Sequence, residues 1–197
     1  MQILIATRNK GKFKEIWEFL KTVPDINMVS PDDVDPNFDI VEDGKTFEEN
    51  ATKKAKSWAE KSGIASLADD AGLEIDALGG EPGVLSRRWP GYEASDEELI
   101  NMTLEKLHEI PMERRMARLR TVVAIAFPNG RIETETAAIE GIIAEKPTEK
   151  REAGYPFRSL FWIPELGKFY FDLTEDEHKR YNHRRKALQK LILRLDS

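Results

Sequence analysis

Two adjacent aspartates, Asp69 and Asp70, follow a short apolar run and precede Ala71 and Gly72. Carboxylate oxygens are the ligands that a hard divalent cation prefers, and such a cation can bridge to phosphates. One of the two carboxylates could instead take a proton from an attacking water. Turn-forming aspartates ahead of a glycine give the same pattern and are commoner than metal sites. The pair alone therefore leaves a metal site, a general base and a turn open.

A second polar segment, Thr7-Arg8-Asn9-Lys10-Gly11-Lys12, lies between an apolar run and a stretch with helical spacing. A turn from a strand into a helix directs backbone N–H groups and the positive end of the helix dipole at one point. A hydroxyl and several cations added there would bind a polyphosphate. A solvated turn explains the same residues, and the segment is not a Walker A sequence.

Two further segments carry charge at helical spacing. Glu49, Lys53 and Lys54 lie on one side of a predicted helix, where they form either a site or an ordinary surface ion pair. His183 and Arg184 begin a basic run near the end of the chain, which is either an anion-binding cluster or a solvated helix face. Taken alone, neither segment favours a site over a charged surface.

The elements that must position these residues can be predicted from hydrophobic periodicity and capping signals. Strands are expected at residues 3–6, 26–29, 65–68, 73–78, 118–127 and 131–145, and helices at 12–21, 46–62, 95–108, 174 onward and 184–195. Thr46 with Glu49 has the form of a capping box. Pro128-Asn129-Gly130 predicts a hairpin turn. The pattern predicts an α/β fold with a partly antiparallel sheet.

Composition narrows the class of protein. The chain has 197 residues, which suits one large domain or two closely joined lobes. Its formal net charge of −6 argues against a nucleic-acid partner, although a local basic pocket for a small anion is compatible with it. Cysteine is absent, which excludes disulfides and thiolate metal sites. No apolar stretch is long enough for a signal peptide or a membrane helix, so we expect no membrane partner and a cytoplasmic location.

In this order, the segments resemble the inosine/xanthosine triphosphate pyrophosphatase family, and the resemblance covers nearly the whole chain. Its most specific stretch, residues 67–91, reads LADDAGLEIDALGGEPGVLSRRWPG, beside a family pattern of the form ADDSGL…ALGGxPGVxSARxxG. ATRNKGK resembles the family's phosphate loop, and TFEENATKKA resembles its TFxENAxxKA element. IPELGK and His183-Arg184 match the closing elements.

The resemblance implies an elongated mixed sheet flanked by helices, with two lobes, a central nucleotide cleft and one domain spanning 1–197. It implies a homodimer that uses Mg²⁺, with Mn²⁺ as an alternative, to cleave a non-standard purine triphosphate into monophosphate and pyrophosphate. Catalysis would fall to Asp70, Lys12 and Lys54, and metal binding to Glu42 and Asp70 with Asp69 or Glu49 assisting. The implied substrate contacts are Thr7, Arg8, Asn9, Lys10, Gly11, Lys12, Ala71, Phe157, Arg158, His178, His183 and Arg184.

The chain departs from the family mainly in the segment that reads the base. Arg158 stands where an Asp is expected, while Phe157 keeps an aromatic. His178 replaces a Lys, although Lys179 is adjacent, and Ala71 replaces a Ser. A guanidinium only donates hydrogen bonds, so Arg158 would favour bases that present acceptors, unless it faces solvent or pairs with Glu152. A different modified nucleotide and a weakly active nucleotide sensor therefore stay open as alternatives.

Overall fold

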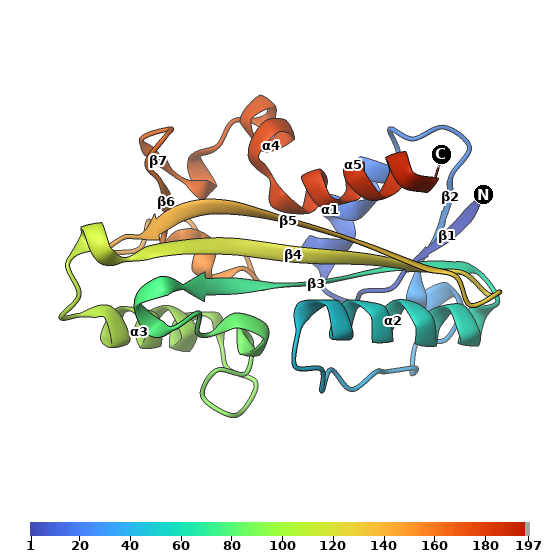
Figure 1. Cartoon of the computed structure of the whole chain (residues 1–197), viewed down its shortest axis with the longest axis horizontal. Helices are drawn as coiled ribbons and strands as arrows, with labels where there is room; N and C mark the ends of the chain where they lie inside the picture. The colour runs from blue at the N-terminus through green and yellow to red at the C-terminus, as the bar shows by residue number, and fades with distance from the viewer. Residues whose placement is uncertain (196–197) are drawn as a thin grey trace. The chain divides into compact units, whose positions relative to one another are not determined.

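A computed structural model of the chain describes residues 1–195. It contains a seven-stranded mixed sheet in the order β2-β1-β3-β4-β5-β6-β7, flanked by helices (Figure 1). The strands are β1 Gln2–Ile5, β2 Asn27–Val29, β3 Ala65–Ile75, β4 Met116–Ala126, β5 Ile132–Ile143, β6 Phe161–Ile163 and β7 Lys168–Phe169. The α-helices are α1 Lys10–Leu20, α2 Phe47–Ser62, α3 Asp96–Leu107, α4 Glu175–Tyr181 and α5 His183–Leu195. The predicted α/β class with a partly antiparallel sheet is confirmed.

The chain divides into two compact units, each built from segments that are distant in sequence. Within the described residues, the first unit contains residues 1–71, 121–137 and 183–195. The second contains residues 72–120 and 138–182. Strands β3, β4 and β5 each contribute residues to both units, so a unit is not a separate stretch of chain.

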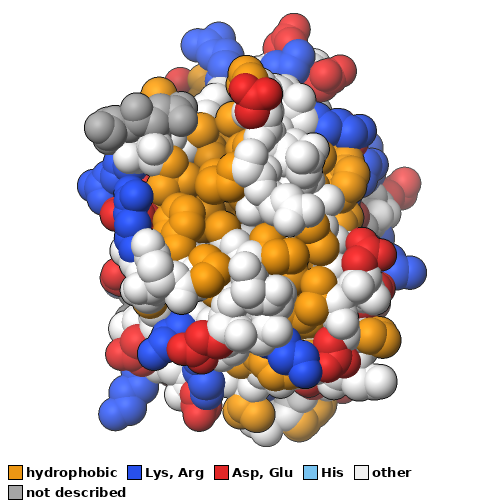
Figure 2. Space-filling model, turned by 90° about the vertical axis from the view of Figure 1, so that its right-hand side faces the viewer, with side chains coloured by type: hydrophobic (Ala, Val, Ile, Leu, Met, Phe, Trp, Pro, Cys, Tyr) orange, Lys and Arg blue, Asp and Glu red, His pale blue; other side chains and the backbone are white. Residues whose placement is uncertain are grey.

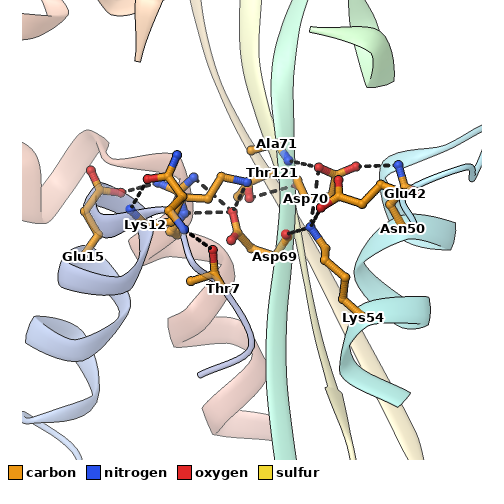
Figure 3. A network of polar contacts seen from close by, with 12 residues as sticks. Thr7, Lys12, Glu15, Glu42, Asn50, Lys54, Asp69, Asp70, Ala71 and Thr121 are labelled. Carbon is orange, nitrogen blue, oxygen red and sulfur yellow. Dashed lines mark hydrogen bonds and ion pairs between the residues drawn. The ribbon is translucent and has the colours of Figure 1, made fainter. Parts of the chain in front are cut away.

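The first unit is organised around parallel strands. β1 pairs in parallel with β2 on one side and with β3 on the other, with Ile3 opposite Ala65 and Ile5 opposite Leu67. Helices α1 and α5 cover one face of these strands and α2 covers the opposite face (Figures 1 and 3). Because both faces are covered, β1 reads as a continuous apolar run with Ile3, Leu4 and Ile5 fully buried.

Strand β3 differs from the prediction. The sequence predicted two short strands, 65–68 and 73–78, with the aspartate pair between them, whereas β3 runs unbroken through Ala65–Ile75. Asp and Gly are depleted in strands and common in turns, which is why the pattern looked interrupted. Asp69 and Asp70 therefore lie inside a buried strand and not at its end.

The second unit has its own apolar core, formed by residues that include Leu73, Leu99, Leu119 and Tyr170. Two very short antiparallel strands, β6 and β7, add to the sheet beside β5. The sequence did not predict them, because three and two residues are too few to show a period. The hairpin between β4 and β5 was predicted correctly, with Phe127 N–H donating to the Arg131 carbonyl across the turn.

The predicted helix starts are largely confirmed. Ser95 and Thr174 each form a reciprocal capping box, with Glu98 and Glu177 respectively. Thr46 accepts from the Glu49 N–H, but Glu49 does not return the bond to Thr46. Its carboxylate accepts instead from the backbone N–H of Lys45, at 2.6 Å. The capping box predicted at α2 is therefore only half formed.

Apolar side chains gather on a face of the first unit near the chain ends (Figure 2). A hollow of about 360 Å³ is lined there by Met1, Val23, Pro24, Asp25, Ile26, Ile192 and Leu195. Within residues 1–195, no helix is both long enough and apolar enough to cross a membrane.

Candidate active site

Asp69 and Asp70 point to opposite sides of β3, because successive side chains in a strand alternate between its two faces. Asp69 faces α1 and α5, whereas Asp70 faces α2 (Figure 3). Adjacent carboxylates in the sequence thus have different neighbours and different electrostatics. The structure therefore does not bring the two carboxylates together at one point.

The Asp69 carboxylate is fully buried between two cations. Its Oδ2 lies 3.2 Å from Lys12 Nζ and 3.0 Å from both Nε and Nη2 of Arg184. Arg184, only 1% exposed, also pairs with Glu15. Burial alone would raise the pKa of Asp69, but Lys12 and Arg184 outweigh it and hold that pKa far below its ordinary value. Asp69 is therefore the anionic member of a buried ion cluster.

Two predicted site residues belong to this cluster. Arg184 stays a predicted substrate contact, and in this structure its guanidinium is bound to Asp69 and Glu15. Asp69 was expected to assist a metal held by Asp70, but it lies on the other side of the strand. Its second oxygen, Oδ1, is buried and accepts no hydrogen bond from residues 1–195, which is costly unless a further donor or cation approaches.

The Asp70 carboxylate is held by neutral donors. Its Oδ2 accepts from Asn50 Nδ2 at 3.0 Å, and its Oδ1 accepts from the Ala71 N–H at 3.0 Å. Lys54 Nζ lies 3.9 Å from Oδ1, and the Thr121 hydroxyl donates to the Asp70 backbone carbonyl. Burial raises the pKa of Asp70, and Lys54 only partly offsets this. A carboxylate with a raised pKa is suited to accept a proton from water.

Lys54 joins the carboxylates on the α2 side. Its Nζ lies 3.0 Å from Glu42 Oε1 and donates to the Asp69 backbone carbonyl at 2.6 Å (Figure 3). Burial alone would lower the pKa of Lys54. The negative charges of Asp70 and Glu42 outweigh that effect, so the pKa of Lys54 lies above its ordinary value. Lys54 therefore carries a buried positive charge beside Asp70 and Glu42.

Glu42 and Asp70 fit a hard divalent cation, because both are oxygen donors that contact the same Lys54 ammonium. Among residues 1–195, no group of three or more His, Cys, Asp or Glu side chains lies close enough to hold a metal. Mg²⁺ that works on phosphates is commonly held by one or two carboxylates together with the substrate. Glu49, the other predicted ligand, is exposed and bound to the Lys45 N–H, so it does not join this pair.

The predicted phosphate segment forms the start of α1. Asn9 is the N-cap, with its side chain accepting from the Lys12 N–H at 3.0 Å, and Thr7 Oγ1 accepts from the Asn9 N–H at 3.3 Å. Lys10, Gly11 and Lys12 make up the first turn, where helix N–H groups attract anions. Arg8 was expected on the phosphates, but its Nη2 donates to the carbonyls of Asp35 and Pro36.

The residues predicted to read the base belong to the second unit. Phe157 is part of its apolar core. Arg158, 5% exposed, pairs with Glu152 at 3.2 Å and stacks on Tyr155, with the guanidinium carbon 3.5 Å from the ring centre. The pairing with Glu152 is one of the two alternatives that the sequence left open, and it is the one this structure has.

His178 and His183, also predicted as substrate contacts, have protein neighbours in this structure. The His178 ring meets the Tyr170 ring edge-on, with centroids 5.4 Å apart. His183 is buried at the first position of α5. The sequence pattern did not indicate Asn50 and Thr121 as partners of Asp70, or Glu15 as a partner of Arg184. A signal could have been found only for Asn50, since it precedes Lys54 by four residues and so shares its side of the helix.

Comparisons with known proteins point to a single family. A model of the Ham1 family matches residues 3–193. A dITP/XTP pyrophosphatase of Desulforamulus reducens is 43% identical over 98% of this chain and 94% of its own, and one of Thermus thermophilus is 39% identical over 98% and 90%. The solved Ham1 protein of Staphylococcus aureus superposes with a TM-score of 0.86 at 32% identity, covering 100% of this chain and 98% of its own.

Proposed function

This chain belongs to the Ham1 family, and we propose that it hydrolyses non-standard purine nucleoside triphosphates, of the ITP, XTP and dITP type, to the nucleoside monophosphate and pyrophosphate. Relatives whose length it nearly spans are named dITP/XTP pyrophosphatases. The observation that carries the proposal is a buried carboxylate of raised pKa, Asp70, beside the buried ammonium of Lys54.

Asp70 is the general base in this proposal. Its raised pKa lets it hold the proton of the water that attacks the α-phosphorus, and Asn50 and the Ala71 N–H keep the carboxylate oriented. Lys54 and Lys12 supply positive charge to the triphosphate as the pyrophosphate leaves. Fixed cations near developing charge are commonly a main source of rate enhancement in phosphoryl chemistry.

Glu42 and Asp70 are the residues that would hold the divalent cation, which we propose is Mg²⁺. When bound, such an ion neutralises phosphate oxygens and the charge of the leaving group. The first turn of α1, with Thr7, Asn9 and Lys12, binds phosphate oxygens through its N–H groups and Lys12. Base recognition by Phe157, Arg158 and His178 stays a prediction.

The test is pyrophosphate release over a panel of ITP, dITP, XTP, GTP, ATP and UTP with Mg²⁺, for the wild type and Asp70→Asn. We expect ITP, dITP and XTP to be cleaved with the highest kcat/KM. Preferred turnover of another nucleotide would change the substrate, and tight binding of all six without turnover would support a nucleotide sensor. Asp70→Asn, which is nearly isosteric, should lose about 10²- to 10⁴-fold in rate.

Three further expectations accompany this function. We propose that the chain acts as a homodimer, that residues 1–197 form one domain and that the protein works in the cytoplasm. Sedimentation or light scattering of the purified protein gives the oligomeric state directly. Limited proteolysis that releases a stable fragment would contradict the single domain.

A further inference from the structure

The side chain of Asn50 is 1% exposed, and two of its hydrogen bonds reach away from its own helix. Asn50 Nδ2 donates to Asp70 Oδ2 at 3.0 Å, and Asn50 Oδ1 accepts from the Gly44 N–H at 2.8 Å. A backbone N–H can only donate, so the amide oxygen must face Gly44 and the amide nitrogen must face Asp70. The orientation of the amide is therefore set by its two partners.

Gly44 lies unusually close to this amide. A Cβ added to Gly44 would lie 2.6 Å from Asn50 Oδ1 and 2.9 Å from the Glu49 Cβ. Its φ is not in the left-handed region, so the glycine is needed for space and not for its backbone conformation. Glu42 precedes Gly44 by two residues. The hydrogen bond from the Gly44 N–H to Asn50 Oδ1 therefore fixes the backbone close to Glu42 against the Asn50 side chain.

Asn50 and Lys54 lie one helical turn apart on the same side of α2. Lys54 contacts both Glu42 and Asp70 through one charged nitrogen on a flexible stem. A point charge attracts carboxylates but does not fix their direction, whereas a planar amide with a donor and an acceptor does. The two residues thus have separate roles at the same pair of carboxylates.

We propose that Asn50 is a positioning residue, which holds Asp70 directly and Glu42 through Gly44 in the arrangement that binds the divalent cation. The inference rests on the proposed function, because that function assigns the metal to Glu42 and Asp70. It implies that loss of the Asn50 amide weakens metal binding more than nucleotide binding. Partners that orient metal ligands commonly change metal affinity by about 10- to 100-fold when they are removed.

The experiment changes the Asn50 side chain itself and, separately, its contact with Gly44. Asn50→Ala removes the amide, and Gly44→Ala pushes against it from the loop without changing any group that contacts Asp70. The double variant completes a thermodynamic cycle. Thr103→Ala is the matched control, because Thr103 is a buried polar residue whose hydroxyl donates to the Leu99 carbonyl within its own helix.

Each protein is titrated with Mn²⁺ alone, followed by the electron paramagnetic resonance signal of the free ion. The Mg²⁺ concentration for half-maximal pyrophosphate release and the nucleotide KM at saturating Mg²⁺ are measured in parallel. We expect Mn²⁺ to bind about 10-fold or more weakly to Asn50→Ala and Gly44→Ala, with a matching rise in the Mg²⁺ requirement and a smaller change in KM. The double variant should bind Mn²⁺ no more weakly than whichever single variant has the lower Mn²⁺ affinity, because both substitutions disrupt the same contact.

Unchanged Mn²⁺ affinity in Gly44→Ala, or additive losses in the double variant, would overturn the inference even if Asn50→Ala failed to fold. An equal loss in Thr103→Ala would show that the effect comes from general destabilisation, which also overturns it. If the wild type binds Mn²⁺ and the Asn50→Ala affinity falls while no nucleotide is cleaved, the proposed function fails and the positioning role stands. A wild type that binds no Mn²⁺ contradicts the metal assignment and the inference together.

Discussion

Replacing Asp69 by asparagine should destabilise the fold, whereas the same replacement at Asp70 should leave its stability unchanged or raise it. Asp69 is fully buried and neutralises Arg184, itself buried, together with Lys12. Asn at this position keeps an oxygen that can accept a hydrogen bond but loses the negative charge. Arg184 then keeps Glu15 as an anionic partner.

The expected magnitude follows from the burial of both partners. Removing one partner of a buried ion pair typically costs about 3–5 kcal/mol. Because an amide oxygen and Glu15 remain for Arg184, we expect the lower end, about 3 kcal/mol. For a chain of this size about 1 kcal/mol corresponds to about 2–4 °C, so the melting temperature should fall by about 6–12 °C.

The pH dependence of the two variants should differ in sign. The pKa of Asp69 is lowered from 3.8 on folding, so its contribution to stability is present above about pH 4 and is lost as the pH falls through the folded-state value. The pKa of Asp70 is raised from 3.8 on folding, so its contribution is present below about pH 4 and is lost as the pH rises through the folded-state value. At pH 7 the Asp70 charge therefore opposes folding.

The assay is urea unfolding followed by tryptophan fluorescence, at pH 7 and at pH 3.5, with EDTA present so that metal binding does not contribute. The free energy lost in Asp69→Asn should shrink at the lower pH. Either of two results would contradict this prediction: an Asp69→Asn variant as stable as the wild type at pH 7 with an unchanged m-value, or an Asp70→Asn variant that loses as much stability as Asp69→Asn.

Four other substitutions test the proposed site. Lys12→Met and Lys54→Met should each raise KM for every nucleoside triphosphate by a similar factor, because a point charge reads phosphate and not the base; a loss confined to one base, measured as kcat/KM, contradicts this. Glu42→Gln should raise the Mg²⁺ needed for half-maximal pyrophosphate release, and an unchanged Mg²⁺ titration would remove Glu42 from the metal site. Arg158→Met should lower the melting temperature, since Arg158 is buried against Tyr155 and Glu152, and should change the kcat/KM ratios among inosine, xanthosine, guanosine, adenosine and uridine triphosphates; unchanged ratios would remove Arg158 from base recognition.

Local signals in the sequence predicted local structure well. The helix starts at Thr46, Ser95 and Thr174 were correct, because an N-cap side chain acts on the backbone only two or three residues away. The resemblance also placed Lys54, Asp70 and Glu42 in one site, and in this structure Lys54 contacts the other two.

What the sequence did not predict depends on contacts between distant residues. Arg184 and Asp69 are 115 positions apart, and nothing in either segment indicated that one would neutralise the other. The hydrogen bond from Arg8 to the Asp35 carbonyl was also not predicted, because a pattern of side chains does not reveal backbone acceptors in a distant loop. The continuity of β3 was not predicted for the same reason. Buried cations from other elements stabilise two aspartates within the strand, and those elements are distant in sequence.

The alternation of Asp69 and Asp70 makes the chemistry of the site sensitive to insertions and deletions. β3 is aligned on β1 by Ile3 opposite Ala65 and Ile5 opposite Leu67. If one residue were deleted between Leu67 and Asp69 while that alignment was kept, every later side chain of β3 would move to the other face. Asp70 would then meet the cations that now ionise Asp69, and the chain would lose its base while keeping both aspartates. A point substitution changes one side chain, whereas a one-residue shift within this strand changes the surroundings of both aspartates at once.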